Sequence, residues 1–290
     1  MIVLLYHDSR KIASLLCENP AFSLDNRRGF CYNDKKYRKE AISVQYFFET
    51  VETIKKGVGF KHFDAVHLMW LAVGILTVAA AAFFCRRADD AGRRRMAKFV
   101  AGLLIADELF KVVCLVTHGL YIPKYLPLHL CSINIILIAV HAFRPTKTLD
   151  NFLYAICIPS AMLALLFPTW TKLPLANFMH IHSFTVHILL LAYPVMLLAA
   201  GMLRPSLGEL PKTLALLAGL AVVALVVNLI FDTNFMFLMS AGKTNPLYIF
   251  KKAFGSHLWG FPVLIPAVLA VMYIPVCLYD RHRRKKAGQQ

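Results

Sequence analysis

The chain has 290 residues, of which 58% are apolar and 17% charged, and its formal net charge is +16. The apolar residues gather in blocks of roughly 20, which is the length that a helix needs to cross a bilayer. These blocks exclude a water-soluble globular protein, and they lack the alternating pattern of a membrane β-barrel. The lysines and arginines lie between and beside the blocks, a pattern that predicts contacts with phospholipids and argues against binding to nucleic acid.

The pattern predicts an all-α fold: a polytopic membrane protein built as a bundle of seven transmembrane helices. Residues 1–46 are polar, hold no segment of membrane length and are predicted to be an N-terminal extension of unknown role. Residues 47–290 are predicted to form the transmembrane domain, with a basic cytoplasmic tail. Its spans are expected near residues 66–85, 96–118, 127–143, 149–170, 177–202, 213–239 and 258–279.

Basic residues predict the orientation of the bundle. The loop at residues 86–98 and the tail at residues 281–286 are both rich in arginine and lysine, which are in excess in cytoplasmic connections. Seven spans put this loop and the tail on the same side of the membrane. We therefore expect the N-terminus outside and the C-terminus in the cytoplasm, and in a bacterium the protein would lie in the cell membrane. Lys55, Lys56 and Lys61 oppose this orientation without reversing the balance.

The second predicted span carries charged residues at membrane depth. Such groups cost roughly 2.5–3.5 kcal/mol each on insertion scales, so they normally face the interior of a bundle. Asp107 and Glu108 precede Lys111 by four and three residues, spacings that put acid and base on one helix surface. The sequence predicts an internal ion pair, which either belongs to a functional site or only fixes helix packing.

The third predicted span opens with Pro127, His129, Cys131 and Asn134. A proline suits the first position of a helix, so Cys131 is expected just past the first turn. A helix N-terminus and a nearby cation favour the thiolate, which is the nucleophilic form of cysteine. The alternative is a small packing residue, because free cysteine is commonly buried and inert. Asn134 is expected on the face of Cys131.

Three histidines stand at the start of the fifth predicted span. His180 and His187 share one helix face with Ser183, whereas His182 is expected to point elsewhere. His180 and His187 are about 10 Å apart along the helix axis, so this pair alone does not chelate one metal ion. No metal or other cofactor is predicted, although ligands from other helices would complete a metal site and this alternative stays open.

The sixth predicted span ends with Asn228, Asp232 and Asn234. Asn228 and Asp232 are four residues apart and share a face, where hydrogen bonding between helices is the alternative to a functional role. In the predicted orientation the polar residues of several spans lie at middle to outer depth. We expect one outward-leaning cavity around the reactive residues, supported by Glu108, Lys111, His129, Asn134, His180, Asp232 and Asn234.

The run Leu-Pro-Leu-His-Leu-Cys at residues 126–131 is a specific motif in a membrane context. Together with Glu108, Lys111, the stretch Ser183–His187 and Asn234-Phe235, it resembles the bacterial YwaF-type integral membrane proteins and the eukaryotic transmembrane protein 164 group. The resemblance covers about residues 47–279. It implies phospholipid acyltransferase activity in the eukaryotic branch, a distant relation to membrane esterases that use a threonine and a histidine, and Cys131 and His187 as the catalytic pair.

We therefore expect a membrane-embedded phospholipid acyltransferase or acyl hydrolase that uses Cys131 and His187 through an acyl-thioester intermediate. Membrane phospholipids are its expected partners, and Asn134, Asn234 or Lys111 would donate hydrogen bonds to the oxyanion. Two alternatives stay open: a transporter or receptor with a polar site inside the membrane, and a metal-dependent membrane hydrolase.

We predict that the connection around Arg94 faces the cytoplasm, because it is among the most basic connections in the chain. In a variant without the native cysteines, a single cysteine beside Arg94 should react with an impermeant thiol reagent only after the membrane is permeabilised. Labelling of intact cells from outside would reverse the orientation.

Overall fold

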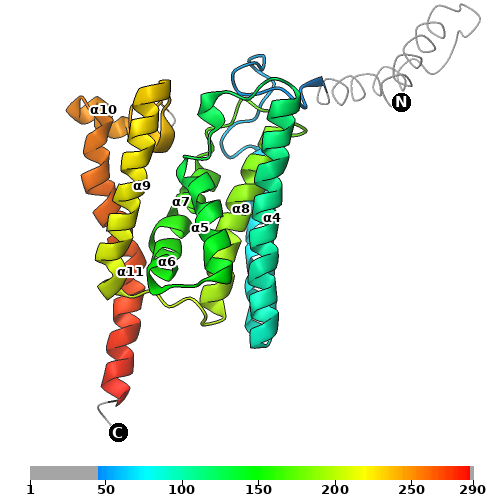
Figure 1. Ribbon diagram of the computed structural model, residues 1–290. Helices are drawn as coiled ribbons and strands as arrows, with labels where there is room; N and C mark the ends of the chain where they lie inside the picture. The colour runs from blue at the N-terminus through cyan, green and yellow to red at the C-terminus, as the bar shows by residue number, and fades with distance from the viewer. Residues whose placement is uncertain (1–44, 244, 288–290) are drawn as a thin grey trace, which may run out of the picture. The chain divides into compact units, whose positions relative to one another are not determined.

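The computed structural model of the protein describes residues 45–243 and 245–287 (Figure 1). Every regular element in this part of the chain is helical, which confirms the predicted all-α fold. The predicted extension at residues 1–46 lies almost entirely outside the described residues, as do the side chains of the basic residues 283–286. The division of the chain into an extension and a transmembrane domain therefore stays a prediction.

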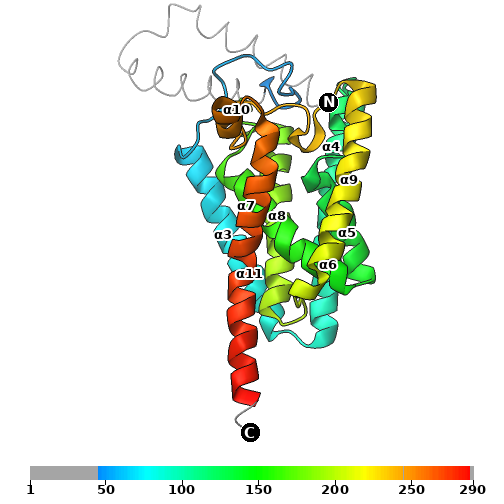
Figure 2. The same cartoon turned by 90° about the vertical axis from the view of Figure 1, so that its left-hand side faces the viewer.

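The long helices coincide with the apolar blocks of the sequence, and α9 and α11 lie on the side that faces the viewer in Figure 2. A π-helical turn, η2 (Leu153–Cys157), joins α6 and α7 into one rod. The helices are α3 (Ala65–Arg87), α4 (Asp90–Thr117), α5 (Leu130–Phe143), α6 (Lys147–Phe152), α7 (Ile158–Leu166), α8 (Phe178–Ala199), α9 (Leu210–Phe231), α10 (Tyr248–Phe254) and α11 (Gly260–Ala287). Single 3-10 turns lie in the connections: η1 (Pro123–Tyr125), η3 (Leu207–Glu209), η4 (Phe235–Phe237) and η5 (His257–Trp259).

Within the described residues, five helical segments are long and apolar enough to cross a membrane: residues 65–87, 147–166, 178–199, 207–231 and 257–278. The chain is therefore an integral membrane protein with several membrane-crossing helices. The predicted number of seven is not confirmed. α5 has only 14 residues, about 21 Å of helix against a hydrocarbon core of about 30 Å, and α4 carries many charged side chains.

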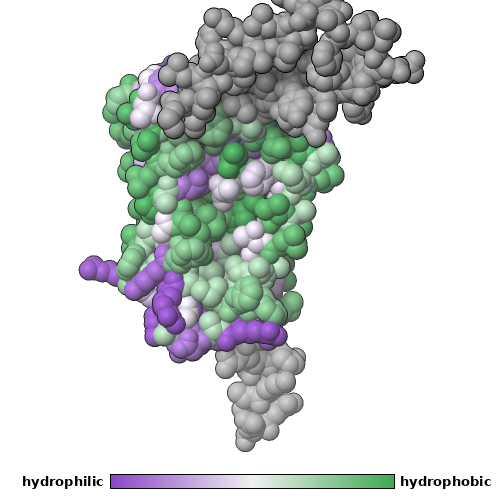
Figure 3. Space-filling view, turned by 90° about the vertical axis from the view of Figure 1, so that its right-hand side faces the viewer, coloured by the Kyte–Doolittle hydropathy of each residue, from purple (hydrophilic) through white to green (hydrophobic). Residues whose placement is uncertain are grey.

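The outer surface suits a lipid environment. Figure 3 shows a face on which hydrophobic residues extend over most of the height of the helices, with hydrophilic residues gathered at one end. Ile75 and Leu76 of α3 and Ile230 of α9 are largely exposed, and such aliphatic surface is unfavourable in water. Exposed arginines, including Arg86 and Arg94, lie at the connection between α3 and α4.

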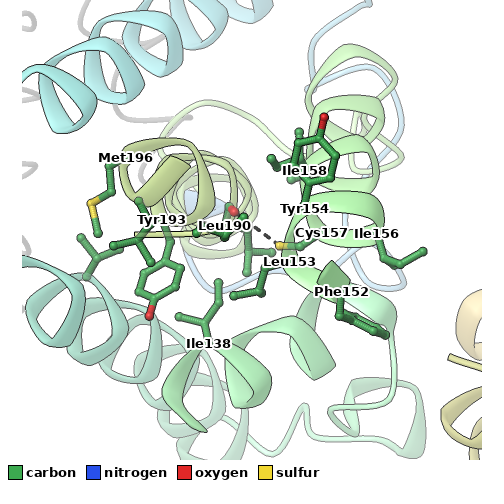
Figure 4. Close-up of a cluster of buried hydrophobic side chains, with 14 of the residues drawn as sticks. Ile138, Phe152, Leu153, Tyr154, Ile156, Cys157, Ile158, Leu190, Tyr193 and Met196 are labelled. Carbon is green, nitrogen blue, oxygen red and sulfur yellow. Dashed lines mark hydrogen bonds between the residues drawn. The ribbon is translucent and has the colours of Figure 1, made fainter. Parts of the chain in front are cut away.

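α8 lies at the centre of the packing and contacts α3, α4, α5 and α7. A helix that is apolar on most of its circumference lies either in a protein core or in lipid, and most side chains of α8 are buried within the protein. In Figure 4, Leu190, Tyr193 and Met196 of α8 lie in one cluster with Ile138 of α5 and with the residues of η2. The thiol of Cys157 in η2 donates to the carbonyl oxygen of Leu190 at 3.4 Å.

Buried polar side chains join the helices around this core. The ring of His141 on α5 lies between the Tyr193 hydroxyl, 2.8 Å from Nδ1, and the Asp150 carboxylate, 2.7 Å from Nε2. The Asn151 amide on α6 donates to the Thr213 hydroxyl on α9 at 3.1 Å. Inside lipid a polar group without a partner costs several kcal/mol, so these bonds restrict which helices can be neighbours.

Asn177 fixes the start of α8. Its Oδ1 atom accepts hydrogen bonds from the backbone N–H groups of Met179 and His180, at 2.9 and 3.1 Å, and so caps the helix. Its Nδ2 atom donates to three backbone carbonyls of the segment 46–49, at 2.7–3.2 Å. The side chain is fully buried, so one amide holds both α8 and a distant stretch of chain.

We predict that Asn177→Ala lowers the free energy of unfolding by at least about 2 kcal/mol. Loss of a helix cap costs about 1 kcal/mol, and buried carbonyls left without a donor cost about 1–3 kcal/mol more. Asp64→Ala is the matched control, because Asp64 caps α3 through local bonds to Lys61 and His67 only, and it should cost about 1 kcal/mol. Unfolding of both variants in one detergent tests this, and equal losses would contradict the linking role of Asn177.

Candidate functional site

A cavity of about 1250 Å³ lies between the helices. Its polar wall comes from α4, the start of α5, the first half of α8 and the segment after α9, and its apolar wall comes from η2, α7, α9 and α11. Most of the residues predicted for the site line this cavity: Glu108, Lys111, His129, Cys131, His187, Asp232 and Asn234.

Two predicted residues do not line the cavity. His180 lies two turns before His187, where the Trp70 indole donates to its Nε2 at 2.9 Å and its Nδ1 donates to the Leu173 carbonyl oxygen at 3.1 Å. Both ring nitrogens are thus occupied, and His180 has a structural role. Asn134 is fully buried one turn beyond Cys131 and is absent from the cavity wall, so neither residue supports the site as expected.

Cys131 lies in the first turn of α5, closer to the helix N-terminus than expected. The prediction that this helix begins at Pro127 is wrong: α5 begins at Leu130, and His129 is its N-cap residue in an extended conformation. The Leu128 N–H bonds to the Leu126 carbonyl oxygen at 2.8 Å, which keeps the preceding residues in a turn. Early N–H groups of a helix have no partner within the helix, and here no side chain caps them.

The charges nearest to Cys131 come from α4. Lys111 and Glu108 act on the thiol electrostatically, and the thiol is within reach of the N–H of Ser132. Lys111 and the helix N-terminus favour the thiolate of the partly buried Cys131, whereas burial, which is the larger effect, and Glu108 oppose it.

His187 lies in the third turn of α8 with one free ring nitrogen. Its Nδ1 is 2.6 Å from the Ser183 carbonyl oxygen. A carbonyl only accepts, so Nδ1 carries the hydrogen and the neutral ring presents Nε2 as a base. The ring stacks on Trp170 with centroids 5.2 Å apart, which fixes its plane. No described residue hydrogen-bonds to Nε2, and His187 borders the cavity.

Cys131 and His187 therefore share one cavity. Among the described residues, no hydrogen bond joins the Cys131 thiol to the His187 ring. The catalytic pairing of these two residues thus stays a prediction, and it requires that His187 Nε2 come within about 3 Å of the thiol or reach it through one water molecule.

The two adjacent acids of α4, Asp107 and Glu108, accept hydrogen bonds from different side chains. Lys111 donates to Glu108 Oε1, and both side chains are largely buried, as the predicted ion pair requires. Asp107 does not share this pair: it accepts a hydrogen bond from the Thr185 hydroxyl on α8 at 2.8 Å. The acidic residues therefore also tie α4 to α8.

His182 is the site residue that sequence reasoning missed. It was expected only to point elsewhere than His180 and His187, but its ring lies between Asp107 and Glu108, at 3.4 and 3.6 Å from their carboxylate oxygens, and it also lines the cavity. The signal was the pair of adjacent acids on α4. Consecutive helical residues diverge by about 100°, so an imidazole on the neighbouring helix, with nitrogens on two sides, can face both.

The segment after α9 is held by two asparagines. Asn228 bonds within its own chain segment, to Phe235 and Thr233, rather than to another helix. The side-chain nitrogen of Asn234 donates to the carbonyl and hydroxyl oxygens of Ser240, and its side-chain oxygen accepts from the backbone N–H groups of Met239 and Ser240. Its predicted role as an oxyanion donor is therefore not available without breaking this loop.

The same segment carries backbone strain beside the cavity. Asp232, Met236 and Phe237 have φ angles of 50°, 56° and 58°, in the left-handed region that non-glycine residues rarely adopt. Such conformations persist where surrounding contacts impose them, and they cluster at functional sites. Here the His257 ring bonds to the Phe237 carbonyl oxygen at 3.0 Å.

Across the described residues, no group of three or more His, Cys, Asp or Glu side chains converges closely enough to hold a metal ion. His129 instead packs edge-on against Phe235, with ring centroids 5.0 Å apart.

Comparison with known proteins gives one result. The family model described as "TMEM164 family" matches residues 62–275, which include Glu108, Lys111, Cys131, His182 and His187. No curated protein and no solved structure matches the chain.

We predict that Glu108→Gln and Lys111→Met each lower the free energy of unfolding by about 3–5 kcal/mol, because each leaves one buried charge without its partner. The double variant should recover much of this loss. Lys212→Met is the control, because Lys212 and Glu209 have the same spacing at an exposed position, where a pair is worth at most about 1 kcal/mol. Stability of Glu108→Gln equal to that of the wild type would contradict the pair.

Proposed function

The chain belongs to the TMEM164 family, and on that premise we propose that it is a membrane-embedded phospholipid acyltransferase or acyl hydrolase that works through an acyl-thioester on Cys131. The observation that carries the proposal is the cavity in which a thiol and an imidazole with a free nitrogen share a polar wall beside a long apolar one.

The size and lining of the cavity support a lipid as the substrate. Pockets for drug-sized ligands have volumes of about 300–1,000 Å³, and this cavity is larger. A lipid ester has one polar region and long apolar chains, which is the division that the cavity wall presents. A polar solute would leave the apolar wall without a matching surface.

The first half-reaction forms the thioester. His187 Nε2 takes the proton of the Cys131 thiol, and the thiolate adds to the ester carbonyl carbon. The tetrahedral intermediate collapses, the carbon–oxygen bond breaks, and the departing alkoxide of the lysophospholipid receives the proton from the His187 imidazolium.

The second half-reaction releases the acyl group. An acceptor hydroxyl gives its proton to His187 and attacks the thioester carbonyl, and the departing thiolate of Cys131 is then reprotonated. A second lipid hydroxyl as acceptor makes the reaction a transfer, and water makes it a hydrolysis, so access of water to the cavity decides between them.

Stabilisation of the oxyanion falls to the start of α5 and to Lys111. Of the three candidate donors, Asn134 lies off the cavity and Asn234 is committed to its loop. The N–H groups of the first turn of α5 carry the positive end of the helix dipole, and Lys111 adds a charge from α4. Glu108 then holds Lys111 in position.

The proposal includes the predicted topology. We propose that α4 and α5 also cross the membrane, which gives seven crossings, with the N-terminus outside and the C-terminus in the cytoplasm. For α4, the support is that the charged side chains of its second half, Asp107, Glu108 and Lys111, have partners inside the protein, so they do not face lipid.

We predict that Cys131→Ala abolishes the activity. Cellular lipids from cells with wild-type protein and with Cys131→Ala should differ in the acyl chains of phospholipids, measured by mass spectrometry. Cys157→Ala is the matched control, because Cys157 is a buried cysteine outside the cavity wall. Cells with this variant should have the same lipid profile as cells with the wild-type protein.

For His187→Ala we expect about 10²- to 10⁴-fold slower labelling of Cys131 by a lipid probe that reacts with thiols, which is the usual contribution of a general base. Labelling should be absent in Cys131→Ala. Unchanged lipid profiles together with retained labelling in both variants would instead favour a transporter, in which the buried charges of α4 relay protons.

A further inference from the structure

The apolar part of the cavity is a groove made from one face of each of three helices. α9 contributes Leu214, Leu217, Ala218 and Ala221, at positions i, i+3, i+4 and i+7 of a helical face. α11 contributes a face with the same spacing between residues 261 and 269, and η2 and α7 supply the opposite wall. Three helix faces thus turn apolar side chains toward a space that no side chain of the described residues fills.

The groove is open along its side. α9 packs against α6, and α11 packs against η2, so contacts with the rest of the bundle do not close the space along the length of either helix. In Figure 2, α9 and α11 stand apart, and α8 is visible between them. Ala218, which lines the cavity, is exposed, as an opening of the groove toward the bilayer requires.

The length of the groove matches a single long chain. From Asp232 back to Leu214 it follows α9 for about 27 Å at 1.5 Å per residue, most of the hydrocarbon core of about 30 Å that the acyl chains of two leaflets fill, so it is long enough for one fully extended chain. Its polar wall lies toward the Asp232 end. The one hydroxyl on the α7 face, that of Ser160, already donates to the Cys157 carbonyl oxygen at 3.0 Å, so it needs no hydrogen bond from a ligand.

We infer that this groove binds one fatty acyl chain of a membrane lipid and that Ala218 and Ala221 determine how long a chain it accepts. The inference rests on the proposed function for the position of the ester, which lies beside Cys131. The remainder of the chain runs between α9, α11 and α7, where burial of each methylene is worth about 0.8 kcal/mol.

Ala218 and Ala221 are the two small residues of the α9 face. Counted along the axis, Ala221 is about 16 Å and Ala218 about 21 Å from Asp232. A larger side chain at either position shortens the free groove from the far end. Ala221→Phe should therefore exclude long chains more strongly than Ala218→Phe.

The test uses full-length protein in nanodiscs and phosphatidylcholines with a photoactivatable group at the end of a short or a long acyl chain. Binding is measured as crosslinking yield in the Cys131→Ala background, where no turnover occurs. We expect the ratio of long-chain to short-chain crosslinking to fall at least about tenfold for Ala221→Phe and less for Ala218→Phe, given the discrimination that apolar pockets achieve per methylene. Ala215→Phe, on an exposed part of α9 outside the groove, should leave the ratio unchanged.

A second arm restores Cys131 and measures the chain length of the acyl group that hydroxylamine releases from the thiol as a hydroxamate. A thioester whose chain length is the same in all variants would overturn the groove assignment while the proposed function stands. Crosslinking that follows the substitutions without any thioester would instead refute the catalytic proposal and leave the groove as a lipid site. If a phenylalanine variant does not fold, Ala221→Leu and Ala218→Leu carry the same order of effects.

Discussion

The side-chain amide of Asn177 joins two parts of the chain that are far apart in sequence, and the geometry of the site depends on it. Its oxygen determines where α8 begins, and its nitrogen ties that point to the segment 46–49. An α-helix rises 1.5 Å per residue, so the start of α8 also determines the height of His182 and His187 in the bundle. A shift of one residue would rotate both rings by about 100°, away from the acids of α4 and the start of α5.

The lipid environment explains why α9 and α11 have no polar face. Each has one face toward the bilayer and another toward the groove, and both surroundings are apolar. Neither helix therefore shows the amphipathic pattern that marks the core-facing side of a helix in a soluble protein. The charged residues are concentrated instead on α4, which packs against α8 and can pair its acids there.

The positions of the long helices could be predicted, because an apolar block of about 20 residues indicates a membrane span. Cys131 and His187 stood out as reactive side chains at membrane depth, but their selection as a pair came from the resemblance to a family. The start of α5 could not be predicted, since its turn is closed by a backbone bond that has no sequence signature. His182 was missed because spacing within α8 does not reveal which face meets α4. The groove could not be predicted, because its apolar residues look the same in sequence as those that face lipid. The catalytic roles of Cys131 and His187 can be established only by measuring activity.

The π-helical turn at residues 153–157 limits how the chain can change in length. A π-turn holds one residue more than an α-turn, and Pro159, which cannot donate a backbone hydrogen bond, follows directly after it. Five residues of a π-turn cover about the same rotation as four residues of an α-helix, so deleting one residue of this turn would restore a regular helix and leave Pro159 and Ser160 near their present orientation. A further inserted residue would instead rotate everything beyond it by about 100°. Over evolutionary time, this stretch should therefore tolerate the loss of one residue far more readily than the gain of another.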